Sequence, residues 1–190
     1  GSKSVAVGNG ALNLQNFTSA TDSFNTAVGH QAGAAVTSGT LNTLIGGLAG
    51  DANTTGASNT AVGVASLGAN TTAAEGVAVG YKALEAVTTG VNNTAIGANS
   101  GRALTTSDRS TFVGNLAGQA TTGRANSFFG CDSGHLITSG ADNTIIGRYS
   151  GNAGGLDIRT SSNNIVLSDG AGNPRAHCDS NADFYIGGVT

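Results

Sequence analysis

The chain has 190 residues with a formal net charge of −3, and it contains 31 glycines while only 10% of its residues are charged. Its 8 scattered lysine and arginine residues cannot form the clustered basic surface that phosphate contacts require, so nucleic acid is not an expected partner. No run of 18 or more apolar residues occurs, which predicts no membrane insertion. A strong glycine excess with few large apolar side chains directs attention to internal repeats.

The chain divides into three parts by its periodicity. The first two residues, Gly1-Ser2, resemble an expression scar. Residues 3–154 are periodic, whereas residues 155–190 leave the period. We therefore expect a repeat domain over residues 3–154 and a separate β-structured segment over residues 155–190.

The repeat is recognised by a glycine that follows a short apolar or β-branched run, as in SVAVG, NTAVG and NTIIG. Most successive copies are 17 residues apart, and nine copies at a nearly fixed spacing do not arise by chance. Their glycines are Gly8, Gly29, Gly46, Gly63, Gly80, Gly97, Gly114, Gly130 and Gly147. A fixed period of this kind is typical of a solenoid, in which each repeat forms one coil.

Each unit has the composition of short strands separated by turns. A small residue stands three positions after the glycine, usually an alanine stands six positions after it, and a Thr-Ser-Gly or Thr-Thr-Gly cluster often follows. Short β-favouring runs bounded by such clusters indicate strands and turns. The sequence therefore predicts an all-β fold, a parallel β-roll or β-solenoid of about nine 17-residue coils, each with two short strands and two turns.

The interior of the coil is predicted from the two-residue alternation of side chains along a strand. The residue before each glycine is apolar in every copy, so we expect this row to fill the coil. The predicted core residues are Val7, Val28, Ile45, Val62, Val79, Ile96, Val113, Phe129 and Ile146.

The residue one position earlier is then expected on the outer face, and it is also apolar in every copy. Apolar stripes of this length are rarely left in water, and a narrow coil buries little surface by itself. We therefore expect copies of the chain to pack against this row. Its larger members, predicted to form the interface between chains, are Leu44, Phe112, Phe128 and Ile145.

The C-terminal segment contains two strand-like runs, residues 162–170 and 181–187. Asp169-Gly170 and Gly172-Asn173-Pro174 between them are turn signals, so a strand–turn–strand arrangement is expected.

The repeat resembles the head repeats of YadA-type trimeric autotransporter adhesins, because Ser4-Val5-Ala6-Val7-Gly8 nearly reproduces their SVAIG core. The 17-residue spacing and the recurring NTAVG look still more like the repeats of phage and prophage tail fibres. The resemblance covers about residues 3–154 and implies a left-handed parallel β-roll in which three chains pack about a three-fold axis. The period is longer than is usual in YadA-type heads, so the shape of the coil is expected to differ. Residues 155–190 are similar to a segment that precedes a self-cleaving chaperone in phage fibres, and that chaperone is expected to be missing or removed.

The resemblance implies a structural and host-attachment protein of the virion. The chain would be a segment of a homotrimeric tail fibre that presents a rigid surface to a receptor on the bacterial cell surface, either a glycan or a protein. The alternative is the head of a bacterial trimeric autotransporter adhesin, located on the bacterial cell surface and binding host or matrix proteins. The expected partners are the chain itself and the receptor, and no cofactor is expected.

Candidate receptor-binding residues come from the positions just after the glycine, which vary most among the repeats. Variable aromatic and charged residues on a regular scaffold suit ligand contacts, although solvated corners would have the same composition. The residues selected are Tyr81, Lys82, Arg148 and Tyr149.

No catalytic or metal-binding residue is assigned. The segment Cys131–His135 is similar to the GDSG motif of serine proteases, but Ser133 occupies the repeat's own small-residue position. The run His177-Cys178-Asp179 would gather metal ligands at a three-fold axis, yet a contact between chains explains it equally well. Cys131 and Cys178 are expected to be free thiols. We do not expect an enzyme.

Two other classes are disfavoured by the pattern. An ice-binding solenoid needs threonines at alternate exposed positions, whereas Thr54 and Thr55 are adjacent and face opposite ways, and the one threonine that most strands carry is expected to point inward with the valine row. A polysaccharide depolymerase needs paired carboxylates, and the 11 acidic residues do not cluster within one coil, although a site between chains stays open.

Overall fold

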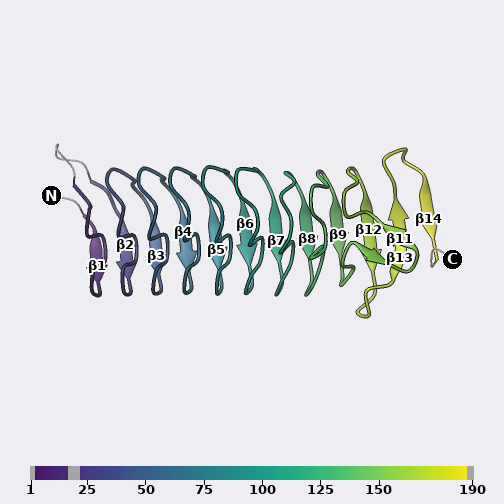
Figure 1. Cartoon of the computed structure of the whole chain (residues 1–190), viewed down its shortest axis with the longest axis horizontal. Helices are drawn as coiled ribbons and strands as arrows, with labels where there is room; N and C mark the ends of the chain where they lie inside the picture. Colours follow the sequence, from purple (N-terminus) through teal and green to yellow (C-terminus); the bar gives the residue numbers. More distant parts are fainter. Residues whose placement is uncertain (1–2, 17–21, 188–190) are drawn as a thin grey trace.

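The structure is a computed structural model that describes residues 3–16 and 22–187, so Gly1-Ser2 lies outside the described residues. The chain forms an elongated rod of stacked coils, with its first and last strands at opposite ends (Figure 1). No helix occurs in the described ranges, and none therefore could cross a membrane. The predicted all-β parallel solenoid, with about nine coils at a spacing near 17 residues, is confirmed.

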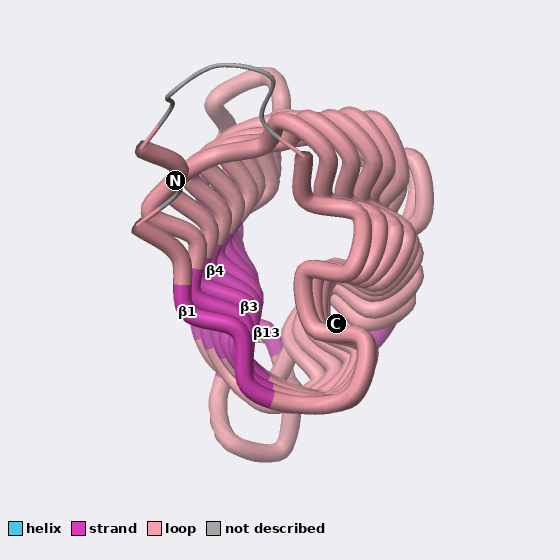
Figure 2. Tube along the Cα trace, turned by 90° about the vertical axis from the view of Figure 1, so that its left-hand side faces the viewer, coloured by secondary structure: helices cyan, strands magenta, loops and turns pink. Residues whose placement is uncertain are grey.

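One three-residue strand stands directly before each repeat glycine. These strands are β1 (Val5–Val7), β2 (Thr26–Val28), β3 (Thr43–Ile45), β4 (Thr60–Val62), β5 (Val77–Val79), β6 (Thr94–Ile96), β7 (Thr111–Val113), β8 (Ser127–Phe129) and β9 (Thr144–Ile146). Each pairs in parallel with the next and in register, so that equivalent residues of successive repeats lie side by side, as Thr43 does with Thr60. Viewed along the rod, the strands gather on one side of the cross-section and loops form the rest (Figure 2).

The repeat glycine is required by the close approach of successive coils. Gly46 has a φ of +133°, which side-chain-bearing residues rarely adopt. A Cβ atom added there would lie 2.5 Å from the carbonyl oxygen of Gly63 in the next coil. The corner after each strand can therefore stack only if the residue has no side chain.

The predicted second strand of each coil was wrong. The residues two and four positions after the glycine, such as Gln31 and Gly33, have φ values of 54° and 59°, and this left-handed backbone interrupts an extended strand. The turns nevertheless bond from coil to coil, because Gly33 N donates to Ala49 O and Ala35 N donates to Asp51 O, each at 2.9 Å. The loop side is thus ordered by the same axial hydrogen bonding as the sheet.

The predicted assignment of the two strand faces was also wrong. In β2–β9 the middle residue is buried, whereas the residues on either side are half-buried or exposed. The predicted core row lies on the outer face: Val7, Val28, Ile45, Val62, Val79, Ile96, Val113, Phe129 and Ile146. The alternation shows which residues share a face, but with apolar residues on both faces it does not show which face is inside.

The four residues predicted to join chains fill the coil instead. Leu44, Phe112, Phe128 and Ile145 are each at most 1% exposed. They fit because the residue opposite, four positions after the glycine, is itself a glycine in these coils. A Cβ atom on Gly118 would come within 2.5 Å of the Phe112 ring.

A row of buried asparagines joins the coils next to the sheet. The Oδ1 atom of each, except that of the last one, Asn164, accepts the backbone N–H of the equivalent residue in the next coil, for example Asn42 N to Asn25 Oδ1 at 2.9 Å and Asn59 N to Asn42 Oδ1 at 3.0 Å. The row consists of Asn25, Asn42, Asn59, Asn93, Asn126, Asn143 and Asn164. Buried amides that are fully hydrogen-bonded fix the axial register of the stack.

The C-terminal segment closes the stack with antiparallel strands. The strands after β9 are β10 (Asn152–Ala153), which still lies in the last repeat, and β11 (Leu156–Asp157), β12 (Ile165–Ser168), β13 (Pro174–Cys178) and β14 (Phe184–Ile186) of the C-terminal segment. Strand β12 still pairs in parallel with β9, so the stack runs one strand beyond the last repeat. The chain then reverses, and β13 pairs antiparallel with β12 and β14. The two predicted strand-like runs contain β12 and β14, and the predicted turn is present, with Asp169 accepting hydrogen bonds from Ala171 and Asn173. The prediction missed β13, which lies between the two runs and pairs with both strands.

Candidate functional site

The outer face of the large sheet carries the apolar row and, beside it, a row that is threonine or serine in seven of the strands β1–β9. The sequence pattern predicts this second row inside as well, but both rows are half-buried or exposed. This outer sheet face comprises the first and third residues of β1–β9, together with their continuation in β12–β14. Ile45, Ile96 and Ile146 on it are 38%, 42% and 51% exposed. No outward position in β1–β9 or β12 carries a charged residue. An uncharged surface of this extent is unusual on a soluble monomer.

The face continues into the C-terminal strands. Ile165 of β12 lies beside Thr144, Cys178 of β13 lies beside Ile165, and Phe184 of β14 lies beside Cys178. Phe184 and Ile186 are exposed. The sheet has 12 strands, and at about 4.8 Å per strand the face is roughly 50 Å long.

The four predicted receptor-binding residues do not form one site. Tyr149 is fully buried, its hydroxyl donates to the Leu156 carbonyl at 2.8 Å, and burial raises its pKa, so it is a structural residue and that prediction was wrong. Tyr81 and Lys82 are in the coil of β5, whereas Arg148 is in the coil of β9. Four strand spacings, about 19 Å, separate these coils. The role of the three remaining residues in binding stays a prediction.

Lys82 belongs to a charged cluster that the sequence prediction missed. Glu85 accepts Lys82 Nζ at 2.9 Å on one oxygen and Arg102 Nε at 2.7 Å on the other. Partial burial acts to raise the pKa of Glu85, but the hydrogen bonds from Lys82 and Arg102 outweigh it and lower the pKa. The sequence does contain a signal for this cluster. The position five residues after the repeat glycine holds polar or charged residues in three successive coils, Glu85, Arg102 and Gln119.

Arg148 is held at the surface by Asp132 of the preceding coil. Its Nε and Nη2 atoms both lie 3.0 Å from Asp132 Oδ2. These residues and His135 border a small cleft of about 240 Å³. The arginine is thus accessible, but its charge is already paired.

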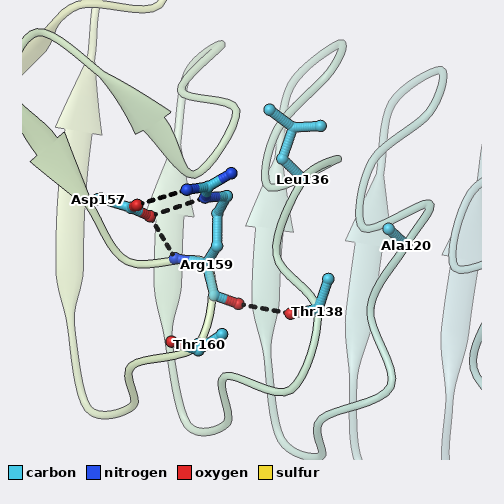
Figure 3. Close-up of a pocket in the computed structure, with 6 residues that line it drawn as sticks. All are labelled: Ala120, Leu136, Thr138, Asp157, Arg159 and Thr160. Carbon is cyan, nitrogen blue, oxygen red and sulfur yellow. Dashed lines mark hydrogen bonds and ion pairs between the residues drawn. The ribbon is translucent and has the colours of Figure 1, made fainter.

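A larger cleft of about 380 Å³ lies where the regular coils meet the β10–β11 hairpin. Arg159 binds Asp157 through Nε at 2.9 Å and Nη2 at 2.7 Å (Figure 3). Thr138 donates its hydroxyl to the Arg159 carbonyl at 3.1 Å, and the exposed Leu136 forms an apolar border. The cleft therefore combines a planar ion pair, a hydroxyl and an apolar side chain within one small surface.

The residues of the metal candidate His177-Cys178-Asp179 point apart. His177 faces the interior, where its Nε2 is 3.1 Å from Asn164 Oδ1 and burial lowers its pKa. Cys178 lies on the outer sheet face, because its partner Ile165 does. Within residues 3–16 and 22–187, no group of three or more His, Cys, Asp or Glu side chains could hold a metal ion.

Comparison with protein-family models, with curated proteins and with solved structures gives no match for this chain.

Proposed function

We propose that this chain is a structural segment of a homotrimeric attachment fibre. The observation that carries the proposal is the outer sheet face, which is uncharged along β1–β9 and β12 and continues without a break to β14. Large exposed apolar patches mark interaction surfaces. Because the same row repeats in every coil, a second copy in the same register meets each apolar residue with an identical one.

The corrected strand faces strengthen this proposal. With Leu44, Phe112, Phe128 and Ile145 inside the coil, the surface left for self-association is the row of Val, Ile and Phe residues before the repeat glycines. The number of chains comes from the resemblance of the repeat to trimeric fibres and adhesins. When three parallel rods pack with their outer sheet faces toward a common axis, those faces are buried. The loop sides then point outward to solvent.

A rigid trimeric rod suits attachment rather than catalysis. Its three identical loop sides can engage repeated ligands on a cell surface at the same time, and the effective concentration of the second and third contacts raises avidity. We propose a phage tail fibre in the virion that binds a glycan or protein receptor on a bacterium. The head of a trimeric adhesin is the second candidate, favoured by the near identity of Ser4–Gly8 to the SVAIG core.

The experiment that tests the trimer is light scattering at micromolar concentration. The wild-type chain should have three times the mass of one 18.4 kDa chain. Ile96→Asp, which would place charges at the shared axis, should give monomers. Ala52→Asp, on the loop side, should stay trimeric, and circular dichroism should show that both variants remain folded.

Cys178 supplies an independent test, because it lies on the same face. In a Cys131→Ser background, mild oxidation should link two of the three chains through Cys178, and Ile96→Asp should abolish the link. A monomeric wild-type chain would refute the fibre proposal.

A further inference from the structure

Two clefts on the loop side share Ala120 as a lining residue, and we treat them together as one groove parallel to the rod. One, of about 520 Å³, is lined by Ala69, Glu85, Ala86, Arg102, Ala103, Gln119 and Ala120. The other is the cleft of Asp157 and Arg159, which also begins at Ala120. The groove therefore runs from the coil of β4 to the coil of β9, five strand spacings or about 24 Å.

The lining of the groove combines a row of alanines with polar side chains. The alanine row is the residue six positions after the repeat glycine, which stacks in four successive coils as Ala69, Ala86, Ala103 and Ala120. Glu85, Arg102 and Gln119 border it in the coils of β5–β7, and Thr138 and Arg159 border it further on. A long shallow groove without deep apolar pockets suits an extended chain that is recognised by hydrogen bonds along its length.

The borders retain unused hydrogen-bonding capacity. Arg102 uses only Nε toward Glu85, so its two terminal nitrogens remain available. Arg159 uses Nε and Nη2 toward Asp157, which leaves Nη1. In the described part of the chain, the Gln119 side chain has no hydrogen bond to another residue. Most of these unused groups are hydrogen-bond donors, so the groove fits a ligand rich in oxygen acceptors.

The charges of the groove restrict the ligand further. Arg102 and Arg159 line the groove together with Glu85 and Asp157, and each carboxylate is already paired with an arginine. A lining without net charge does not suit the phosphates of a nucleic acid. Planar paired side chains beside the apolar Leu136 instead match a ligand with adjacent hydroxyl groups and an apolar ring face.

We propose that this groove binds a linear polysaccharide of the bacterial surface, lying parallel to the rod axis. Arg102, Gln119 and Arg159 donate to its hydroxyl and carboxylate oxygens, and its sugar rings lie on the alanine row and on Leu136. The proposal rests on the proposed fibre function, because the loop side faces outward when the outer sheet faces meet. A trimer then offers three parallel grooves.

The test uses an array of purified capsular polysaccharides in one arm and of lipopolysaccharide O-chains in the other, probed with the full chain. The wild-type trimer should bind at least one polysaccharide, and the arm that it recognises identifies the source. Arg102→Ala and Arg159→Ala should each weaken that binding at least tenfold. Arg124→Ala, an exposed arginine that pairs with Asp142 and does not line the groove, is the matched control and should bind as wild type.

The outcomes separate this inference from the fibre proposal. A folded trimer that binds no polysaccharide in either arm overturns the groove and leaves the fibre standing. Binding that survives both Arg102→Ala and Arg159→Ala overturns it as well. A chain that is monomeric by light scattering refutes the fibre proposal itself. Circular dichroism and light scattering on every variant exclude misfolding as the cause of lost binding.

Discussion

The coils of β4 and β5 and the coils of β7 and β8 share the three-residue strand and the repeat glycine but fill their interiors from opposite sides. In the first pair the buried strand residue is alanine, and a leucine, Leu67 or Leu84, fills the space from the loop side. In the second pair the strand carries Phe112 or Phe128, and the loop side has a glycine. In these four coils one large side chain fills the interior from either side. In the coil of β6 both Ala95 and Gly101 are small, and Phe112 and Leu84 of the neighbouring coils lie against Gly101 instead.

The same two regions differ in the asparagine row and in surface charge. In the coil of β5 the row is interrupted by Gly76, whose N–H still donates to Asn59 Oδ1 at 2.9 Å. In the coil of β7 the row is continued by Ser110, whose hydroxyl accepts the Asn126 N–H at 3.3 Å. Glu85 carries an ion cluster in the coil of β5, whereas Gln119 at the equivalent position of β7 is neutral. Three sets of substitutions probe these differences, from the largest expected effect to the smallest.

The largest effect is expected inside the coil of β7. Phe112→Ala should lower the free energy of unfolding by about 3–5 kcal/mol, because it leaves a cavity. Gly118→Leu alone should also destabilise, by about 1–3 kcal/mol, because its side chain meets the ring. The double variant reproduces the arrangement of Ala61 with Leu67 and should be more stable than Phe112→Ala alone. Urea unfolding at one fixed protein concentration measures all three.

The left-handed backbone does not prevent this exchange. Leu67 already has a φ of 50° at the position equivalent to Gly118, whose φ is 60°. If the double variant loses the sum of the two single effects, the two sides of the coil do not share one volume.

Much of the fold could be predicted from the sequence, because the glycine period determines where each strand ends. The interior could not, since strands of three residues with apolar side chains on both faces fit either orientation. The decisive signal lies elsewhere in the repeat, where Leu67 and Leu84 accompany alanine and Gly118 accompanies Phe112. The charged groove was missed because Arg102 and Arg159 belong to different coils. They come to lie on the same surface only when the coils stack. Tyr149 was misassigned because the β10–β11 hairpin that covers it interrupts the period.

A smaller effect is expected from the asparagine row. Asn59→Ala removes the acceptor of the buried Gly76 N–H and a donor to the Ala73 carbonyl, bonds of 2.9 and 2.8 Å. A buried donor without a partner costs about 1–3 kcal/mol. Ser110→Ala removes only the longer bond to Asn126 and should cost less. Exposed Asn115→Ala is the control, with little expected change in the urea midpoint. Equal costs for Asn59→Ala and Asn115→Ala would contradict a stabilising role for the row.

The smallest effect is expected from Glu85, and it depends on pH. Because the folded-state pKa of Glu85 is lowered, its stabilisation is present above the ordinary glutamate pKa of about 4.3 and is lost as the pH falls through the lower folded value. At pH 7 and low salt, Glu85→Gln should cost about 0.2–1 kcal/mol, as exposed ion pairs do. The difference from wild type should shrink in acid and in high salt, because protonation and screening each remove the attraction to Lys82 and Arg102. Gln119→Ala, at the neutral equivalent position, should have an effect that does not vary with pH. If the difference in unfolding free energy between wild type and Glu85→Gln persists unchanged at pH 3, Glu85 stabilises its coil by packing rather than by charge. The coils of β5 and β7 would then differ at this position in side-chain shape alone.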